Sequence, residues 1–140
     1  MNNRIDIYTD GACSGNPGPA GIGVVLLYNN HQKEISKFIG DATNNIAELT
    51  AIKEGLEAIK DSSRRIPVVV YTDSSYCYGL LTKDWKPKKN IELVMEIRQL
   101  TTQFSYLGFK KVKGHADNPG NNRADELATK AVETRKNGIT

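Results

Sequence analysis

The stretch IDIYTDGACSGNPGPAG (residues 5–21) decides the fold, because a run of β-forming residues ends on Asp10 and a turn-forming Gly-Asn-Pro-Gly-Pro segment follows. The triplet Tyr-Thr-Asp returns in VVVYTDSSYCYGLL (residues 68–81), again at the end of a β-forming run. Short β-forming runs bounded by Gly, Pro, Asn or Ser predict strands. The repeat therefore predicts two strands that each end on a carboxylate, Asp10 in the first and Asp73 in the second.

The pattern on either side of these two strands predicts the remaining elements. Short, turn-rich joins favour antiparallel hairpins at the start of the chain. Thr43 is the expected N-cap of the first helix, whose apolar residues recur at helical spacing. The expected elements are strands at 4–9, 21–28 and about 34–40, a helix at 45–60, a strand at 66–72, a short helix after Asp73, a helix at about 90–102, a strand near 105–112 and a helix from about Asn121.

This order predicts an α/β fold, with a mixed sheet and helices packed on it. The first and fourth strands are expected to be parallel neighbours. Ligands of such sheets gather at the carboxyl ends of the strands. Asp10 and Asp73 both fall at that edge. Tyr8 and Tyr71, from the same triplets, are interpreted as a chance match between aromatic residues that suit strands.

The length of 140 residues predicts a single domain over residues 1–140, with about 135–140 as a loose C-terminal tail. The sequence has no apolar run long enough for a signal peptide or a membrane span, so we expect a cytoplasmic protein without a membrane partner. Cys13 and Cys77 lie too far apart in the chain to suggest a zinc site, and so do His31 and His115. We assign no function to His31, which falls in a hairpin turn.

The net charge of +3 is mild and fits many proteins that do not bind nucleic acid. The distribution is more informative, because Lys83, Lys86, Lys88 and Lys89 surround Trp85. Basic clusters that include an aromatic residue suit phosphate backbones. On charge alone, however, a solvated surface is the favoured interpretation.

Asp10 and Asp73 are the first candidate site residues. Adjacent strands would place them about one strand spacing apart, roughly 5 Å. Carboxylates that close repel each other unless a cation lies between them. Oxygen ligands without His or Cys favour Mg²⁺ or Mn²⁺ over zinc. The alternative is structural, with Asp10 opening a turn and Asp73 capping the next helix. The pair alone leaves both interpretations open.

Two further acids lie at the edges of buried helical stripes. Glu48 borders the apolar stripe of the first helix, where an unpaired carboxylate costs several kcal/mol. Asp125 borders the stripe of the last helix, although an acid in a first helical turn is also stabilised by the helix dipole. With the two aspartates, four carboxylates converge on one corner of the predicted sheet. A two-metal phosphodiester site needs this arrangement.

The sequence resembles ribonuclease H type 1 closely. The matching segments occur in the family's order and extend from residue 5 to about residue 132; they are YTDGACSGNPGPAGIG, TNNIAELTAI, YTDSSY and VKGHADNPGNNRADELA. The resemblance implies a ribonuclease H-like fold, with a mixed five-stranded sheet in β-β-β-α-β-α-α-β-α order and helices on both faces.

The resemblance also implies the catalytic residues. Asp10, Glu48, Asp73 and Asp125 match the family's four metal-binding acids. They would hold two Mg²⁺ ions, with Mn²⁺ as a substitute and Asp10 bridging both ions. His115, in KGHADNPGNN, matches the histidine of the family's mobile loop, which assists proton transfer or product release. A loop histidine also titrates near neutral pH.

Substrate-binding residues follow by the same matching. Asn16, Asn44 and Asn45 match asparagines that contact sugars and the minor groove of the RNA strand, where 2′-hydroxyls are accessible. Thr43 matches a residue that binds a DNA-strand phosphate. Turn and helix-start roles for the asparagines are compatible with binding.

The chain departs from the family pattern at two places. Ser75 stands where many members carry a glutamine, and its shorter side chain makes the match weak. The segment GLLTKDWKPKKN (residues 79–90) is much shorter than the basic protrusion of some members. Trp85 and its lysines either contact the DNA strand or only pack the loop, and the sequence leaves both possibilities open, together with any effect on salt sensitivity.

The implied function is a metal-dependent endoribonuclease that hydrolyses the RNA strand of RNA–DNA hybrids by two-metal in-line attack, leaving 5′-phosphate and 3′-hydroxyl ends. Its family role is to remove RNA primers and R-loops, and a monomer is expected. A non-catalytic hybrid-binding module would lack at least one acid. A sugar kinase-like ATPase would need a second domain, and integrase-type nucleases lack the TNN and KGHADNPGNN segments.

Overall fold

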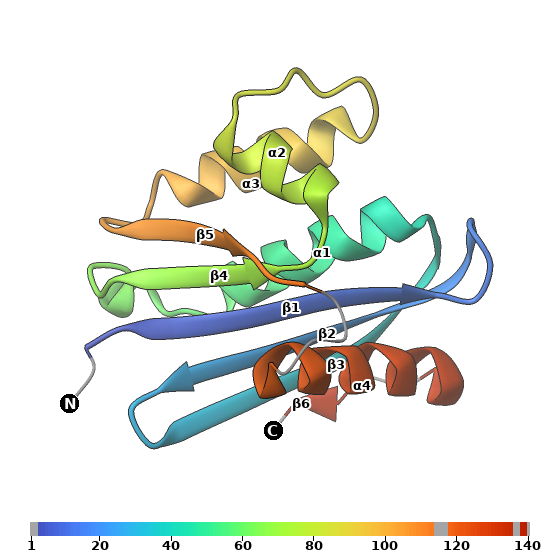
Figure 1. The fold of residues 1–140 in the computed structure, drawn as a ribbon, viewed down its shortest axis with the longest axis horizontal. Helices are drawn as coiled ribbons and strands as arrows, with labels where there is room; N and C mark the ends of the chain where they lie inside the picture. The colour runs from blue at the N-terminus through green and yellow to red at the C-terminus, as the bar shows by residue number, and fades with distance from the viewer. Residues whose placement is uncertain (1–2, 114–117, 136–137, 140) are drawn as a thin grey trace.

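The computed structural model describes residues 3–113, 118–135 and 138–139 (Figure 1). Its elements are β1 (Ile5–Cys13), β2 (Gly18–Tyr28), β3 (His31–Ala42), α1 (Asn44–Glu57), a 3₁₀ helix (Asp61–Ser63), β4 (Val68–Thr72), α2 (Ser75–Thr82), α3 (Ile91–Thr101), β5 (Leu107–Lys111), α4 (Pro119–Thr134) and β6 (Gly138–Ile139). The order of the long elements is the predicted one. The short 3₁₀ helix was not predicted.

The sheet has the strand order β5-β4-β1-β2-β3-β6. β1 pairs antiparallel with β2 and parallel with β4, which confirms the predicted mixed sheet and its parallel neighbours. The expectation of a loose tail after Thr134 is wrong for Gly138 and Ile139, which pair with Ser36 and Ile35 at the edge of β3. The unpaired backbone N–H and C=O groups of an edge strand can pair with such a short segment. Two residues are too few to produce the alternating pattern by which a strand is predicted from sequence.

β1 is longer than the predicted strand at 4–9, because it continues past Asp10 to Cys13. Gly11 looks like a strand breaker in the sequence. In the structure, a Cβ on Gly11 would lie 2.6 Å from the backbone carbonyl carbon of Ala47, so glycine permits α1 to approach the strand closely. Asp10 therefore lies within β1 and not at its end. Since Asp10 opens no turn, the structural alternative for this residue is wrong.

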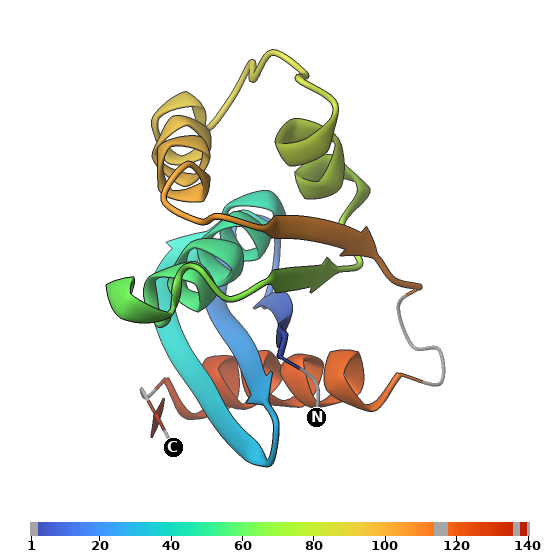
Figure 2. The same cartoon turned by 90° about the vertical axis from the view of Figure 1, so that its left-hand side faces the viewer.

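Helices cover both faces of the sheet, as expected. α1, α2 and α3 contribute to the main hydrophobic core on one face, through residues such as Leu49, Leu80 and Ile97. α4 packs on β1, β2 and β3 from the other face (Figure 2). The site acids are therefore supplied from both sides of a single sheet.

The starts of the helices exclude the structural roles considered for Asp73 and Asp125. Thr43 caps α1 as predicted, because its side chain accepts a hydrogen bond from the Ile46 N–H at 3.2 Å. Ser74, and not Asp73, caps α2 by accepting from Cys77 N–H at 3.1 Å. α4 begins at Pro119, two residues earlier than predicted, and no acidic residue lies in its first turn. Asp125 therefore has no first-turn dipole role.

Within the described ranges, every helix is too short or too polar to cross a lipid bilayer.

Candidate active site

The two Tyr-Thr-Asp triplets lie side by side on β1 and β4. Their parallel register pairs Tyr8 with Tyr71 and goes no further toward the carboxyl ends. Beyond this point the Thr9 hydroxyl donates a hydrogen bond to the Tyr71 carbonyl at 3.0 Å, within the buried interior. The aspartates that follow, Asp10 and Asp73, therefore lie just beyond the last paired residues of these two neighbouring strands.

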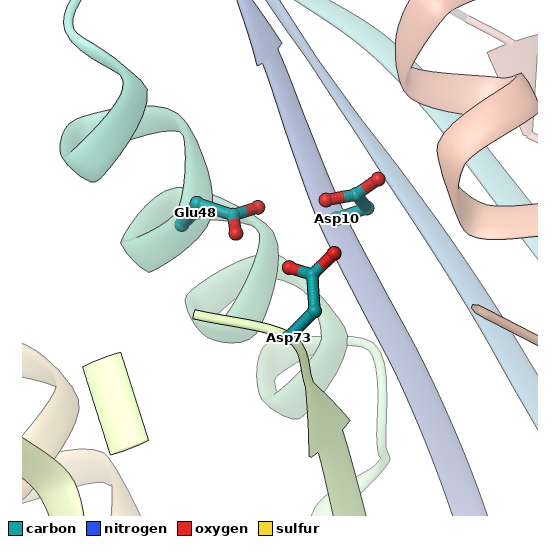
Figure 3. A group of neighbouring side chains, drawn as sticks. All are labelled: Asp10, Glu48 and Asp73. Atoms are coloured by element: carbon teal, nitrogen blue, oxygen red, sulfur yellow. The ribbon is translucent and has the colours of Figure 1, made fainter. Parts of the chain in front are cut away.

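Asp10, Glu48 and Asp73 form one carboxylate cluster. Each offers an oxygen, and the three oxygens all lie within 4.8 Å of one another. Figure 3 shows the three carboxylates pointing toward a common space, Asp10 from β1, Glu48 from α1 and Asp73 from the end of β4. Residues 10, 48 and 73 are distant in sequence, so the fold brings these three acids together.

Gly11 connects the strand to the helix at this cluster. Its backbone N–H donates to Asp10 Oδ1 at 3.0 Å and also donates a short hydrogen bond to Glu48 Oε1. The close approach of α1 at Gly11 makes the second contact possible. One backbone N–H thus orients two of the three carboxylates.

Asp125 reaches the site from α4 but does not belong to the compact three-acid cluster. It lies close enough to Asp10 to raise the pKa of that carboxyl through a hydrogen bond and through its charge. Gly23 is the β2 partner of Asp10, and a Cβ there would lie 1.9 Å from the Ala124 carbonyl oxygen. The α4 backbone therefore rests directly on the strand beside Asp10, which brings Asp125 to it.

Burial and mutual repulsion perturb the acids. Burial, followed by the charges of Asp73 and Asp125, raises the pKa of Asp10 to about 7, against a lowering hydrogen bond with Glu48. Burial, followed by the charge of Asp10, raises the pKa of Glu48 well above its ordinary value. A cation would relieve this unfavourable charge. The all-oxygen, anionic donor set fits a hard divalent metal ion.

A groove is formed by the β1–β2 turn, the start of α1, α2 and the loop that follows α2. It encloses a cavity of about 640 Å³. Its lining residues are Asn16, Thr43, Asn44, Asn45, Tyr76, Leu80, Trp85, Lys86, Pro87, Lys88, Lys89 and Asn90. Asn16 Oδ1 accepts a hydrogen bond from Asn44 N–H at 3.1 Å, which ties the β1–β2 turn to the start of α1.

Sequence comparison decides the family. A sequence model of the family described as RNase H matches residues 2–133. The chain is 44% identical over 147 residues to the ribonuclease H of Chlorobaculum parvum, covering 95% of this chain and 98% of that protein. It is 43% identical over 156 residues to that of Thermoanaerobacter pseudethanolicus, covering 98% of both.

The chain belongs to the ribonuclease H family. Solved structures of ribonucleases H agree with this fold. RNase H1 from Halobacterium salinarum NRC-1 matches with a TM-score of 0.79 at 32% identity, covering 94% of this chain and 98% of that one. LC11-RNase H1 in complex with an RNA/DNA hybrid matches with a TM-score of 0.80 at 32% identity and the same coverage. The protein is thus an enzyme of the ribonuclease H type.

The structure brings together most of the candidate site residues of this ribonuclease H. Asn16, Thr43, Asn44, Asn45 and Trp85 all line the groove. Ser75 is exposed in the first turn of α2 and is not among the groove residues. His115 lies outside the described residues, so its role stays a prediction.

Sequence reasoning missed several contributors. The prediction of a chance match for Tyr8 and Tyr71 is wrong, because their rings stack with centroids 4.3 Å apart and planes 7° apart. Thr9 ties the two triplets together, as described above. The repeat itself was the available signal, because identical triplets on parallel neighbours place identical side chains opposite one another. Tyr76 and Asn90 carried no comparable signal.

Proposed function

We propose that this protein is an endonuclease that hydrolyses the RNA strand of RNA–DNA hybrids, leaving 5′-phosphate and 3′-hydroxyl ends. The observation that carries the proposal is the three-acid cluster, whose oxygens lie within 4.8 Å of one another in a chain of the ribonuclease H family. The related LC11-RNase H1 has been solved with an RNA/DNA hybrid, which supports the substrate class.

Asp10, Glu48, Asp73 and Asp125 would hold the metal ions, which we propose to be two Mg²⁺, with Mn²⁺ as a substitute. When bound, such ions supply a water nucleophile of lowered pKa and stabilise the charge on the leaving 3′-oxygen. The chain's own contribution is orientation. The Gly11 N–H fixes the carboxylates of Asp10 and Glu48, and Thr9 fixes the spacing of the strands that carry Asp10 and Asp73.

The groove would hold the hybrid beside the acids. Asn16, Asn44 and Asn45 offer amide donors and acceptors to ribose hydroxyls, which distinguish RNA from DNA. Thr43 would contact a DNA-strand phosphate, although its hydroxyl already accepts the N-cap hydrogen bond of α1. Trp85 would contact the DNA strand. Ser75, which is exposed and precedes the groove residue Tyr76, would also contact the hybrid.

Cleavage of labelled hybrid, single-stranded RNA and duplex DNA with Mg²⁺ tests this function. We expect the wild type to cut only the RNA strand of the hybrid, and Asp10→Asn to lose nearly all activity while remaining folded. Equal cutting of duplex DNA, or full activity of Asp10→Asn, would contradict the proposal.

In the same assay His115→Ala should slow turnover while binding is kept, since we assign it proton transfer or product release.

Removal of RNA primers and R-loops is the cellular role that fits this activity. The cytoplasmic location, the monomeric state and the single-domain organisation also stay predictions. Size measurement in solution and cell fractionation would test the first two of these.

A further inference from the structure

The segment between α2 and α3, residues 83–90, is a short loop that forms one wall of the groove. It carries Trp85, which is the single tryptophan of the chain, together with Lys86, Lys88 and Lys89. Such a loop without secondary structure would ordinarily be mobile, and ordering it on binding would weaken affinity. Its position therefore needs a physical cause.

Arg98 on α3 provides one restraint. Its Nε and Nη2 donate to the Leu80 carbonyl at 3.2 and 2.7 Å, and Nη2 also donates to the Trp85 carbonyl at 2.6 Å. The Leu80 carbonyl belongs to the last turn of α2. One planar guanidinium thus joins α3, the end of α2 and the loop through charge-assisted hydrogen bonds.

Gly79 provides a second restraint, because the indole of Trp85 lies directly against it. A Cβ on Gly79 would lie 2.2 Å from the Trp85 ring, so only glycine leaves room for this packing. Trp85 is still 46% exposed, and it lines the groove with its free side. The ring therefore both packs the loop and faces the groove. The two possibilities that the sequence left open, packing of the loop and contact with the DNA strand, are thus compatible with each other.

We propose that Arg98 is a positioning residue for the substrate groove, which, together with Gly79, holds the 83–90 loop so that Trp85 and its lysines face the DNA strand of the hybrid. This inference rests on the proposed function. Arg98 is not among the residues that line the groove, so it acts through the backbone of Trp85. The loop then binds preorganised, without the ordering cost that a free loop would incur.

A purely structural role would also explain the two bonds to Leu80, because a cation near a helix C-terminus stabilises the helix. The bond to Trp85 is different, because it reaches beyond the helix into the loop. A suitable test must therefore separate loss of stability from loss of loop position. Arg64 offers a matched control, because its Nε donates to the Ile59 carbonyl, just past the end of α1, at 3.1 Å.

The experiment compares Arg98→Lys with Arg64→Lys. Each change keeps the positive charge and removes the planar fork. For Arg98→Lys we expect KM for the hybrid to rise roughly fivefold while kcat changes less than about twofold, since ordering the loop weakens binding before chemistry. The tryptophan emission of the free protein should shift to the red and become easier to quench with acrylamide. Arg64→Lys should leave KM and emission unchanged, even if both variants lose thermal stability.

Gly79→Ala keeps the test decisive if Arg98→Lys fails to fold. Alanine favours an α-helix over glycine, so α2 should remain intact, while the added Cβ displaces the Trp85 ring. We again expect a higher KM and a red-shifted emission. Unchanged emission and KM in both variants, with active wild-type enzyme, would overturn the role of Arg98 and Gly79. A wild type that neither binds nor cleaves the hybrid would instead overturn the proposed function, while the emission shift still reports on the loop.

Discussion

At the scale of single residues, Asp10 is the buried member of the three-acid cluster. It is 6% exposed, and burial, followed by the charges of Asp73 and Asp125, raises its pKa to about 7, while its hydrogen bond with Glu48 acts in the opposite direction. In the unfolded chain an aspartate ionises near pH 4. Between these values the folded state binds a proton that the unfolded state has lost, so stability falls as pH rises.

This difference predicts that Asp10→Asn stabilises the metal-free protein at alkaline pH. The effect should be absent below about pH 4, grow between pH 4 and 7, and reach about 1–3 kcal/mol above pH 7. Thermal unfolding in EDTA at pH 5 and pH 8 measures it. Asp41→Asn, an exposed aspartate on β3, is the control and should change little at either pH. No gain for Asp10→Asn at pH 8 would contradict the assigned cost of burying a charged Asp10 beside other acids.

At the scale of elements, the spacing between β1 and β4 decides how the two aspartates meet. The parallel ladder ends at Tyr8 and Tyr71, and the Thr9 hydroxyl makes the next link at 3.0 Å. The residues just before this link, Tyr8 and Tyr71, stack on each other, and Tyr8 packs on the face of the sheet that α4 covers. A Cβ on Gly120 would lie 2.5 Å from the Tyr8 ring. The start of α4 therefore packs on Tyr8, one ring of this pair.

Thr9→Val should loosen this junction without changing the shape of the core. Loss of one buried hydrogen bond predicts a destabilisation of about 1–2 kcal/mol. Because the Thr9 hydroxyl makes the last link between the two strands before Asp10 and Asp73, we also expect weaker Mg²⁺ affinity, measured by calorimetric titration. Thr9→Ser keeps the hydroxyl and should retain most of that affinity. Equal affinity in the valine variant would show that the backbone alone sets the spacing.

At the scale of the whole molecule, a net charge of +3 gives little general attraction for nucleic acid. The lysines of the 83–90 loop concentrate positive charge at the groove, since Lys86, Lys88 and Lys89 all line it. Electrostatic binding of this kind depends on the release of counterions and so weakens with salt.

We predict that Lys88→Gln lowers the slope of log KM against log salt concentration by about 0.7–0.9, as expected when one phosphate contact is lost. Steady-state cleavage across a range of salt concentrations measures the slope. Lys33→Gln, an exposed lysine on β3 that does not line the groove, is the matched control and should leave the slope unchanged. An identical slope for Lys88→Gln would remove this lysine from the binding surface.

Much of this architecture was predictable because it depends on local pattern. The spacing of apolar residues predicted α1, and Thr43 predicted its first turn. The order of the elements predicted that the first and fourth strands are parallel neighbours, which the β1–β4 pairing confirms, and Asp73 directly follows β4. The predicted ends of the elements were less accurate. Gly11 predicts the end of a strand when the sequence is read alone, but in the folded protein the strand continues through it, and its lack of a side chain lets α1 pack closely.

The sequence by itself determined the mixed sheet and the order of its long elements, since both follow from residue type and periodicity along the chain, and it supplied the four candidate acids, which the family resemblance also implies. Only the tertiary structure decided that Asp10, Glu48 and Asp73 form the compact cluster while Asp125 stands beside Asp10. It also decided that Arg98 reaches Trp85. The physical reason is that burial, repulsion and hydrogen bonding act between atoms close in space, and residues 10, 48, 73 and 125 become neighbours only when the chain folds.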